Sequence, residues 1–206
     1  MKASRESILA SRSYEDLREE LSGFACRECG LSRSRTQIVV DRGNPAADIL
    51  LIGEAPGAEE DRLGQAFVGR SGRLLDSMLL EAGIDPVEDV LIANIAKCRP
   101  PDNRRPTRDE AQACLPYLRR QIELARPRVV GLLGATAVEH MLAGGKKLQV
   151  SKLAGRMLED PLWPGLAFLV LFHPAFILRN PPKRRLMVRH LKRLRCEHPV
   201  RAEGRA

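Results

Sequence analysis

Long hydrophobic runs and nucleotide-binding loop signatures are missing from this chain of 206 residues. No apolar stretch approaches the roughly 20 residues of a membrane-spanning helix, and the segment MKASRESILASRSYEDLREE lacks the continuous apolar core of a signal peptide. We therefore expect a cytoplasmic protein without membrane association. The segment GEAPG is not followed by Gly-Lys-Ser/Thr, so a nucleoside triphosphate site of the common kind lacks its lysine.

Disulfide bonds are also not expected, although the chain has five cysteines, because the cytoplasm keeps thiols reduced. Cys26 and Cys29 form a CxxC pair, and Cys98 and Cys114 lie far along the chain. This pattern favours a tetrathiolate site, and the spacing alone suits either zinc or an iron–sulfur cluster. Cys196 has no partner by spacing.

The charge of the chain is strongly basic, with a formal net charge of +8. Such an excess favours polyanionic partners, but it also fits a soluble protein without them. The segment RNPPKRRLMVRHLKRLR, residues 179–195, is rich in Lys and Arg and has no acidic residue. It is either a solvated helix face or a segment that contacts phosphates.

Short apolar runs alternate with amphipathic stretches along the chain, which predicts an α/β fold with a parallel sheet covered by helices on both faces. A chain of this length, with 44% hydrophobic residues, suits a single domain, placed at residues 1–198, before a disordered tail at 199–206. Residues 6–21 show helical periodicity before the CxxC loop. Thr107 and Glu110 fit a capping box that begins a long helix, with Cys114 two turns inside it.

Polar residues follow three of the apolar runs. They lie at the carboxyl ends of the expected strands, which is where ligands bind in open parallel sheets. Glu54 follows DILLIG, Asn94 lies near the end of DVLIANI, and His173 follows LAFLVLF. Each has a structural explanation on its own: a surface carboxylate in a turn, an Asn that caps a loop, and a packed His. Together they indicate a site, in which the Asn94 amide offers an acceptor beside a donor and suits the edge of uracil but not of cytosine.

Aromatic residues make up only 4% of the chain, so a phenylalanine in a loop is notable. Phe67 lies in GQAFVGRSG, before a helix with a glycine-rich first turn. It could anchor the loop to the core or form a stacking platform for a base.

The ordered set GEAPGAEED, GQAFVGRSG, NIAKCRPPDNRRPT and HPAFILRNP, with its four cysteines, resembles the family 4 uracil-DNA glycosylases of the iron–sulfur type. The resemblance implies a three-layer α/β/α fold with a central, mainly parallel four-stranded sheet. It also implies removal of uracil from DNA to leave an abasic site in base excision repair. One departure is Ala66, where a proline often precedes the stacking aromatic.

The resemblance assigns roles by matching position. Gly53, Glu54 and Ala55 would line the uracil pocket, Phe67 would stack on the base, and Asn94 would read its edge. His173 would donate a hydrogen bond to O2, and Glu54 would either position water or bind the base. Cys26, Cys29, Cys98 and Cys114 match the ligands of a structural 4Fe-4S cluster. For DNA binding we expect Leu178 as a wedge and phosphate contacts by Arg179, Lys183, Arg184 and Arg185.

Two rival interpretations make different predictions. The uracil-crosslinking branch of the superfamily has a histidine nucleophile after the second motif, and CRPPDNRRPT contains none. A non-catalytic nucleic-acid-binding module with a zinc tetrathiolate would bind DNA in a salt-dependent way and release no base. We expect a monomer that acts on uracil-containing DNA, single- or double-stranded. The sequence does not indicate whether a sliding clamp binds it.

Overall fold

A six-stranded sheet with the order β1-β3-β2-β4-β6-β5 forms the centre of the molecule. The structure is a computed structural model that describes residues 3–144 and 148–197. The four inner strands run parallel, as predicted. The predicted number of strands was too low, because short antiparallel strands extend both edges. The strands are β1 (Arg42–Gly43), β2 (Ile49–Gly53), β3 (Val90–Asn94), β4 (Val129–Leu133), β5 (Met157–Glu159) and β6 (Ala167–Leu171).

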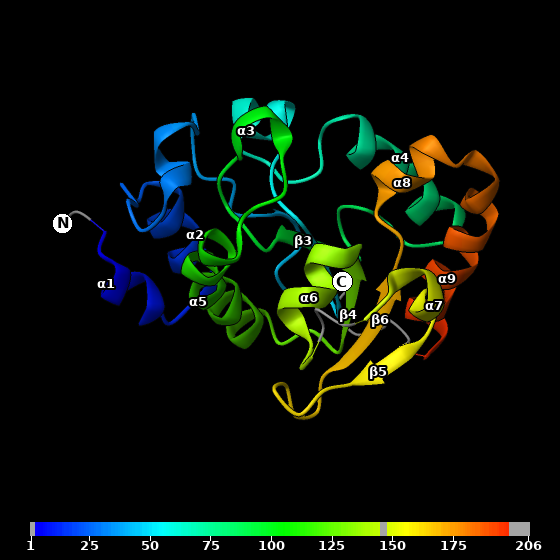
Figure 1. The fold of residues 1–206 in the computed structure, drawn as a ribbon. Helices are drawn as coiled ribbons and strands as arrows, with labels where there is room; N and C mark the ends of the chain where they lie inside the picture. Colours follow the sequence, from blue (N-terminus) through cyan, green and yellow to red (C-terminus); the bar gives the residue numbers. More distant parts are fainter. Residues whose placement is uncertain (1–2, 145–147, 198–206) are drawn as a thin grey trace.

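Helices cover both faces of this sheet (Figure 1). The α-helices are α1 (Arg5–Leu9), α2 (Tyr14–Ser22), α3 (Ala58–Leu63), α4 (Arg70–Glu81), α5 (Arg108–Ala125), α6 (Ala135–Met141), α7 (Val150–Leu153), α8 (Pro174–Arg179) and α9 (Arg184–Glu197). Short 3₁₀ turns are η1 (Gly30–Arg33), η2 (Pro101–Asn103) and η4 (Pro181–Lys183). The fold is therefore the expected α/β arrangement.

The sheet separates two hydrophobic cores, because side chains alternate between its faces. In β2, Ile49 and Leu51 pack with α4 and α9, whereas Leu50 and Ile52 pack with α5 and α6. These side chains are all fully buried, and each stabilises the fold by roughly 1.5–3 kcal/mol. Strands buried on both faces explain why the apolar runs in the sequence are continuous.

A third hydrophobic cluster packs α1, α2 and the CxxC loop beside the polypeptide that follows β3. The single helix expected over residues 6–21 is wrong, since α1 ends at Leu9 and α2 begins at Tyr14. The Ser13 side chain accepts a hydrogen bond from the Asp16 amide and caps α2. Serines that bond to nearby backbone compete with a continuous helix, which accounts for the break.

The long helix α5 begins as predicted. Thr107 and Glu110 form the expected capping box, and Cys114 lies inside the helix. No helix in the described ranges is long and apolar enough to cross a membrane. The predicted disordered tail and the Cys196 side chain lie outside the described residues.

Candidate active site

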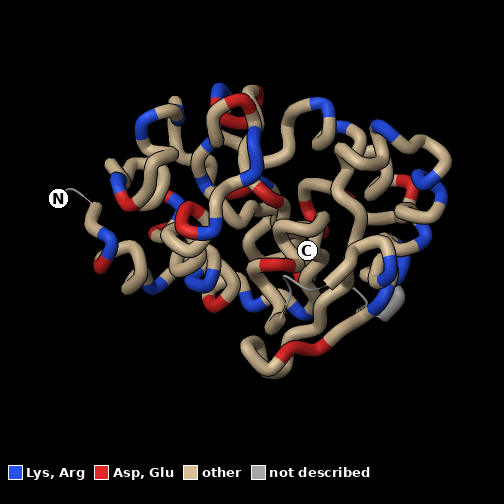
Figure 2. Tube along the Cα trace, viewed as in Figure 1, with Lys and Arg blue, Asp and Glu red and all other residues tan. Residues whose placement is uncertain are grey.

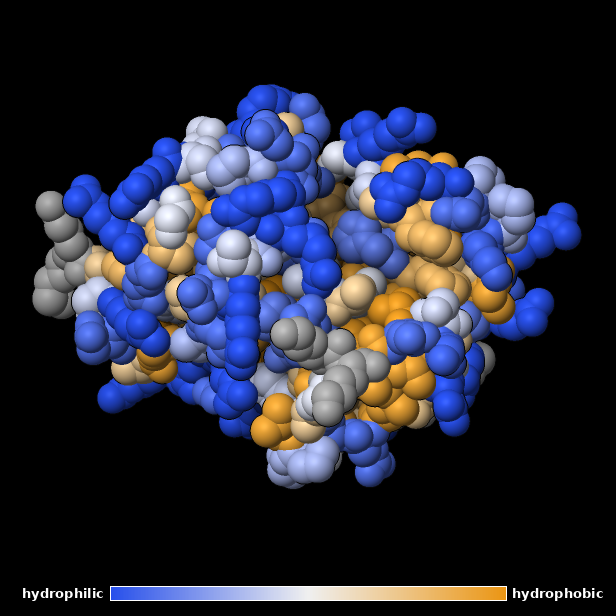
Figure 3. Space-filling model, viewed as in Figure 1, coloured by the Kyte–Doolittle hydropathy of each residue, from blue (hydrophilic) through white to orange (hydrophobic). Residues whose placement is uncertain are grey.

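A cavity of about 520 Å³ opens at the carboxyl end of the parallel strands. The surface is hollowed between α3 and α8 in the view of Figure 3. The cavity wall brings together the predicted site residues Glu54, Ala55, Phe67, Asn94 and His173. The polar residues expected at three strand ends thus lie around one cavity, and their roles stay a prediction.

Gly53, at the end of β2, is required because its neighbours leave no room for a side chain. A Cβ at this position would lie 2.4 Å from Cζ of Phe67 and 2.5 Å from Oδ1 of Asn94. Asn94 is paired with Gly53 in the parallel register of β2 and β3. The glycine thus lets the aromatic ring and the amide approach each other at the base of the cavity.

The loop that carries Phe67 is held in an unusual backbone conformation, with φ of 54° at Phe67. Such a φ is uncommon for a bulky residue and persists where the surroundings impose it. Glu60 supplies part of that support, since its carboxylate accepts hydrogen bonds from the Gly57 and Gly69 amides at 3.1 and 2.7 Å. Phe67 is only 6% exposed, and its ring centroid lies 5.8 Å from that of His173.

Asn94 has an unsatisfied acceptor in the cavity wall. Its side chain is 1% exposed, and Oδ1 has no hydrogen-bond partner within the described part of the chain. Its backbone carbonyl is engaged, because buried Lys97 donates to it at 3.0 Å. Leaving a buried acceptor unpaired costs about 1–3 kcal/mol, so this oxygen calls for a donor from outside the protein.

His173 is held as a neutral imidazole with a defined tautomer. Its Nδ1 accepts a hydrogen bond from the Ala175 amide at 3.2 Å, so the ring proton resides on Nε2. Burial, with a smaller contribution from the Arg179 charge, lowers the pKa of His173 to about 4. The ring therefore presents a neutral N–H donor in the cavity wall at physiological pH.

Glu54 is anchored through one carboxylate oxygen. Thr136 donates its hydroxyl hydrogen to Oε2, and Nε of Arg105 lies 3.5 Å from the same oxygen. No described residue donates a hydrogen bond to Oε1. The carboxylate, with 30% side-chain exposure, lies at the edge of the cavity with one oxygen open.

Residues 40–195 match the family model of the uracil DNA glycosylase superfamily. The chain is similar to the type-4 uracil-DNA glycosylase of Thermotoga maritima, with 45% identity over 75% of this chain and 79% of that protein. The enzyme of the same name from Archaeoglobus fulgidus is 39% identical over 84% of this chain and 86% of its own length. The type-4 uracil-DNA glycosylase of Sulfurisphaera tokodaii is 36% identical over 89% of this chain and 84% of its own length. The chain belongs to the type-4 uracil-DNA glycosylases.

In this member of the type-4 family, three of the four predicted ligand cysteines, Cys26, Cys29 and Cys98, belong to the hydrophobic cluster beside the polypeptide that follows β3. The fourth, Cys114, lies on α5. Cys26 and Cys29 line a cavity of about 550 Å³. Burial raises the pKa of both Cys98 and Cys114, and the neighbouring cysteines add to the rise: Cys26 and Cys29 act on Cys98, and Cys98 and Cys29 act on Cys114. The fold therefore brings the four thiols together from three segments.

Four thiols are a donor set that suits an iron–sulfur cluster. Within residues 3–144 and 148–197, no three His, Cys, Asp or Glu side chains are close enough to hold one ion. Burial raises the pKa of Cys98 to about 11 and that of Cys114 to about 12. Metal binding would therefore have to displace the thiol protons.

The Arg35 guanidinium forms a hydrogen bond with the sulfur of Cys98. Nη1 of Arg35 donates to Sγ of Cys98 at 3.4 Å, and Nη2 donates to the Cys26 carbonyl at 2.8 Å. Arg35 thereby links the CxxC segment to the polypeptide that follows β3. A hydrogen bond of this kind to a ligand sulfur suits an anionic cluster.

The residues expected to bind DNA differ in how the fold uses them. Arg179 lines the cavity and is exposed. Lys183 and Arg185 are exposed as well, outside the cavity lining. None of the three forms an ion pair with a described residue. Arg184 is instead paired with Glu81 on α4. Figure 2 shows that Lys and Arg are spread over both ends of the molecule and are not confined to the segment of α8 and α9. The phosphate contacts remain a prediction, and Arg184 is the weakest candidate among them.

Two residues of the site were not anticipated from the sequence, namely Arg105 and Thr136. Thr136 lies in the first turn of α6, directly after β4. The search for polar residues at strand ends covered the other three parallel strands. Extended to the end of β4, it would have identified this threonine. Arg105 gives no such signal, because it is one basic residue among several in CRPPDNRRPT.

Proposed function

We propose that this chain removes uracil from DNA by hydrolysing the N-glycosidic bond, which leaves an abasic site and begins the repair of deaminated cytosine. The observation that carries the proposal is the unpaired Oδ1 of Asn94, buried beside Phe67 and His173 in the cavity wall. The family membership of the chain supports the same reaction.

Base selection follows from the hydrogen-bonding capacity of Asn94. Uracil offers the N3 hydrogen to Oδ1 and accepts from Nδ2 at O4, whereas cytosine presents an acceptor at N3 and a donor at N4. Cytosine would thus leave the buried Oδ1 unpaired. A target nucleotide must leave the base stack to reach this wall, at a cost of a few kcal/mol, and the Phe67 ring offers a stacking surface in return.

Bond cleavage places negative charge on the departing uracil and positive charge on the sugar. The Nε2 hydrogen of His173 would bond to O2, and this bond strengthens as the uracil anion forms. A neutral donor suits this role because the proton stays on the ring throughout. The contribution of His173 is therefore made mainly in the transition state.

Glu54 suits the positioning of the water nucleophile. With Oε2 anchored by Thr136 and Arg105, Oε1 is available to accept a hydrogen bond from water at the edge of the cavity. The water oxygen would bond to C1′ of the sugar as the C1′–N1 electron pair leaves with uracil, and Glu54 would accept the water proton.

The thiolates of Cys26, Cys29, Cys98 and Cys114 would hold a 4Fe-4S cluster. When bound, the cluster supplies iron–sulfur bonds that cross-link the CxxC loop, the polypeptide after β3, and α5. Its role is structural in this proposal. The stretch from Asn94 to Cys98 connects the base-reading strand to this cross-link. We place the protein in the cytoplasm as a monomer.

DNA would be engaged from the side of α8. Leu178 is partly exposed near the end of this helix and is the proposed wedge, and Arg179, Lys183 and Arg185 are the proposed phosphate contacts. Replacing Arg179 should weaken DNA binding and reduce its salt dependence. Replacing Arg184 should affect binding less, because its partner is Glu81.

The decisive experiment incubates the protein with an oligonucleotide that contains one uracil, followed by alkali to cut abasic sites. We expect strand scission at the uracil and none at a cytosine in the same position, with Asn94→Asp greatly impaired on uracil. Single- and double-stranded substrates are compared in parallel. Salt-dependent binding without scission would instead support the non-catalytic zinc module, which also lacks the visible absorption of an iron–sulfur cluster.

A further inference from the structure

The orientation of Glu54 is set by a chain of contacts that runs from α6 to the loop after Cys98. Thr136 is 1% exposed, and its hydroxyl lies between Arg105 and Glu54. Nε of Arg105 donates to Oγ1 of Thr136 at 2.9 Å, and Nη2 donates to Glu139 at 3.1 Å. The chain of contacts therefore includes two carboxylates, one guanidinium and one hydroxyl.

The direction of the hydrogen bonds in this chain is fixed by the chemistry of arginine. A guanidinium has N–H donors and no acceptor, so the Thr136 oxygen must accept from Arg105. The Thr136 hydroxyl hydrogen is then free to point only toward an acceptor, and the Glu54 carboxylate is that acceptor. The arrangement holds Oε2 and leaves Oε1 without a donor from the described residues.

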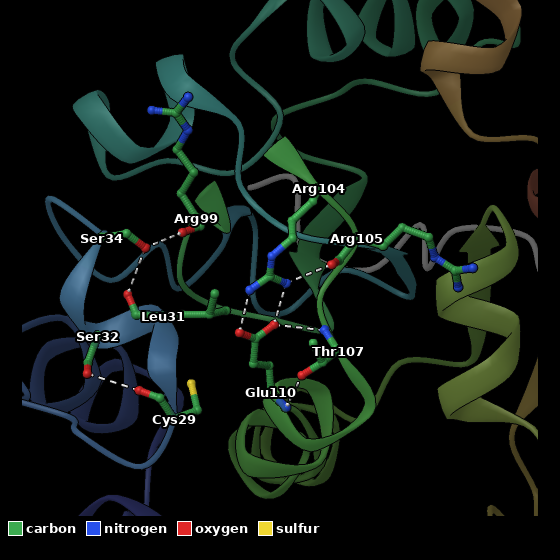
Figure 4. Close-up of polar contacts among 9 residues, drawn as sticks. All are labelled: Cys29, Leu31, Ser32, Ser34, Arg99, Arg104, Arg105, Thr107 and Glu110. Carbon is green, nitrogen blue, oxygen red and sulfur yellow. Dashed lines mark hydrogen bonds and ion pairs between the residues drawn. The ribbon is translucent and has the colours of Figure 1, made fainter. Parts of the chain in front are cut away.

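Arg104 and Arg105, neighbours in the same loop, contact different helices. Arg104 turns back to α5, where it donates to both oxygens of Glu110 at 2.8 and 2.7 Å. The side chain of Arg105 extends the other way, toward α6 (Figure 4). Cys98 and Cys114 bracket this segment in the sequence. The loop between these two cysteines thus reaches the Glu54 carboxylate at the cavity through Arg105.

We propose that Thr136 and Arg105 are positioning residues for Glu54, fixing Oε2 so that Oε1 faces the water that attacks the sugar. This inference rests on the proposed function, because it gives Glu54 the task of holding water. Arg105 is 54% exposed, so a phosphate contact is the competing role. A phosphate contact would act on DNA affinity, whereas a positioning residue acts on the rate of the chemical step.

The test compares Thr136→Val with Thr136→Ser under single-turnover conditions, alongside the dissociation constant for DNA. Valine keeps the shape and removes the hydroxyl, whereas serine restores it. We expect Thr136→Val to excise uracil roughly 10- to 100-fold more slowly, as for loss of a hydrogen bond to a charged group, with DNA affinity unchanged. Thr136→Ser should recover most of the rate.

A second comparison uses the Glu54→Gln variant. In that background Thr136→Val should cause no further loss, because the residue acts through the carboxylate. Arg105→Ala should reduce the rate about 10-fold and leave the affinity nearly unchanged. Arg108→Ala is the matched control, since it removes the same charge from an exposed position of the neighbouring helix turn. Arg105→Ala also tests the inference at a surface position if Thr136→Val does not fold.

Three outcomes would overturn the inference. These are an unaffected rate in Thr136→Val and Arg105→Ala, a loss confined to DNA affinity, or an equal further loss in the Glu54→Gln background. If Glu54→Gln itself excises uracil at the normal rate, the positioning role fails while the glycosylase function stands. Absence of excision by the unmodified protein would instead reject the proposed function.

Discussion

The cavity and the cysteine region use their polar groups in opposite ways. In the cavity, Asn94 Oδ1 is buried without a hydrogen-bond partner in the described part of the chain. The side-chain hydrogen bonds of His173 and Glu54 to described residues run through Nδ1 and Oε2, which leaves Nε2 and Oε1 open. Around the cysteines, polar groups are bonded to the protein itself: Tyr117 donates to Glu28 at 2.6 Å, and Arg35 donates to Cys98 and Cys26. In these two regions, the unused capacity lies where a substrate would enter and the satisfied capacity lies at a structural support. Buried groups elsewhere, such as Gln121 Oε1 and His190 Nδ1, also lack partners among the described residues, so the contrast holds for these two regions only.

The two regions meet at Lys97, which lies between Asn94 and Cys98. Its ammonium is fully buried and donates to the carbonyls of Asn94 and Val40 at 3.0 and 3.4 Å. Burial lowers the pKa of Lys97 to about 8. Because polar groups around the cysteines bond to the protein itself, a change there should reduce stability. A change in the cavity should reduce excision and leave stability intact.

The largest expected effect is that of Cys98→Ala, and it concerns stability. Bound metal can contribute on the order of 10 kcal/mol to a small domain that depends on it, so we expect a much lower unfolding temperature. Iron content and visible absorption should fall in parallel. In molecules that remain folded, the affinity for DNA should fall more than the rate of bond cleavage.

The control for this variant is Cys196→Ala, since the sequence gives that cysteine no partner. It should retain the iron, the absorption and the unfolding temperature. A Cys98→Ala protein that is as stable as the unmodified chain but unable to cleave would reverse the contrast between the two regions.

Asn94→Ala should have the next largest effect, and it concerns catalysis. A site built to bond a substrate N–H discriminates strongly, so we expect kcat/KM on uracil to fall roughly 10³-fold or more. The unfolding temperature should stay the same or rise, because the unpaired Oδ1 contributes no hydrogen bond to the folded protein. Calorimetry beside the excision assay measures both quantities, and a large loss of stability would mean that this oxygen is structural.

His173→Ala should lower the single-turnover rate about 10²-fold, as for loss of one donor to a developing anion. Its DNA affinity should change little, and His173→Gln should recover part of the rate through its amide donor. Because the pKa of His173 is about 4, the unmodified protein should show no inflection from this residue between about pH 5 and 8. Equal losses of rate and affinity would refute the role.

The sequence predicted the cavity better than it predicted the supports around it. The apolar runs identified β2, β3, β4 and β6, because strands buried on both faces are continuous in sequence. The edge strands β1 and β5 are too short for any periodicity to reveal them. Asn94 and His173 were found because polar residues at strand ends stand out against apolar runs.

The contacts that hold the site were not readable, because they join residues distant in the chain. Arg105 reaches Thr136 and Glu139 across more than 30 positions, and nothing in its local sequence distinguishes it from Arg104 or Arg108. The unpaired Oδ1 of Asn94 is likewise a property of the folded packing. Composition and periodicity describe which groups are present, and only the tertiary arrangement determines which of them remain unpaired.

The smallest effect should come from Glu110→Gln, which alters a support without touching the cavity chemistry. The Arg104 guanidinium, helped by the Thr107 amide, lowers the pKa of Glu110 from 4.5 to about 2. The lowered value means that its contribution to stability is complete above pH 4.5 and is lost as the pH falls through about 2. Glutamine loses the ion pair with Arg104 and should therefore reduce the free energy of unfolding by about 1 kcal/mol at pH 7, the upper end for a pair with one exposed partner. The difference in stability should narrow as the pH falls toward about 2 and disappear below it. Urea unfolding across this range measures the difference, and Glu59→Gln, on an exposed ion pair, should show almost none. A difference that persists below about pH 2 would show that glutamine disturbs the packing at this position, since the unmodified side chain is then neutral too.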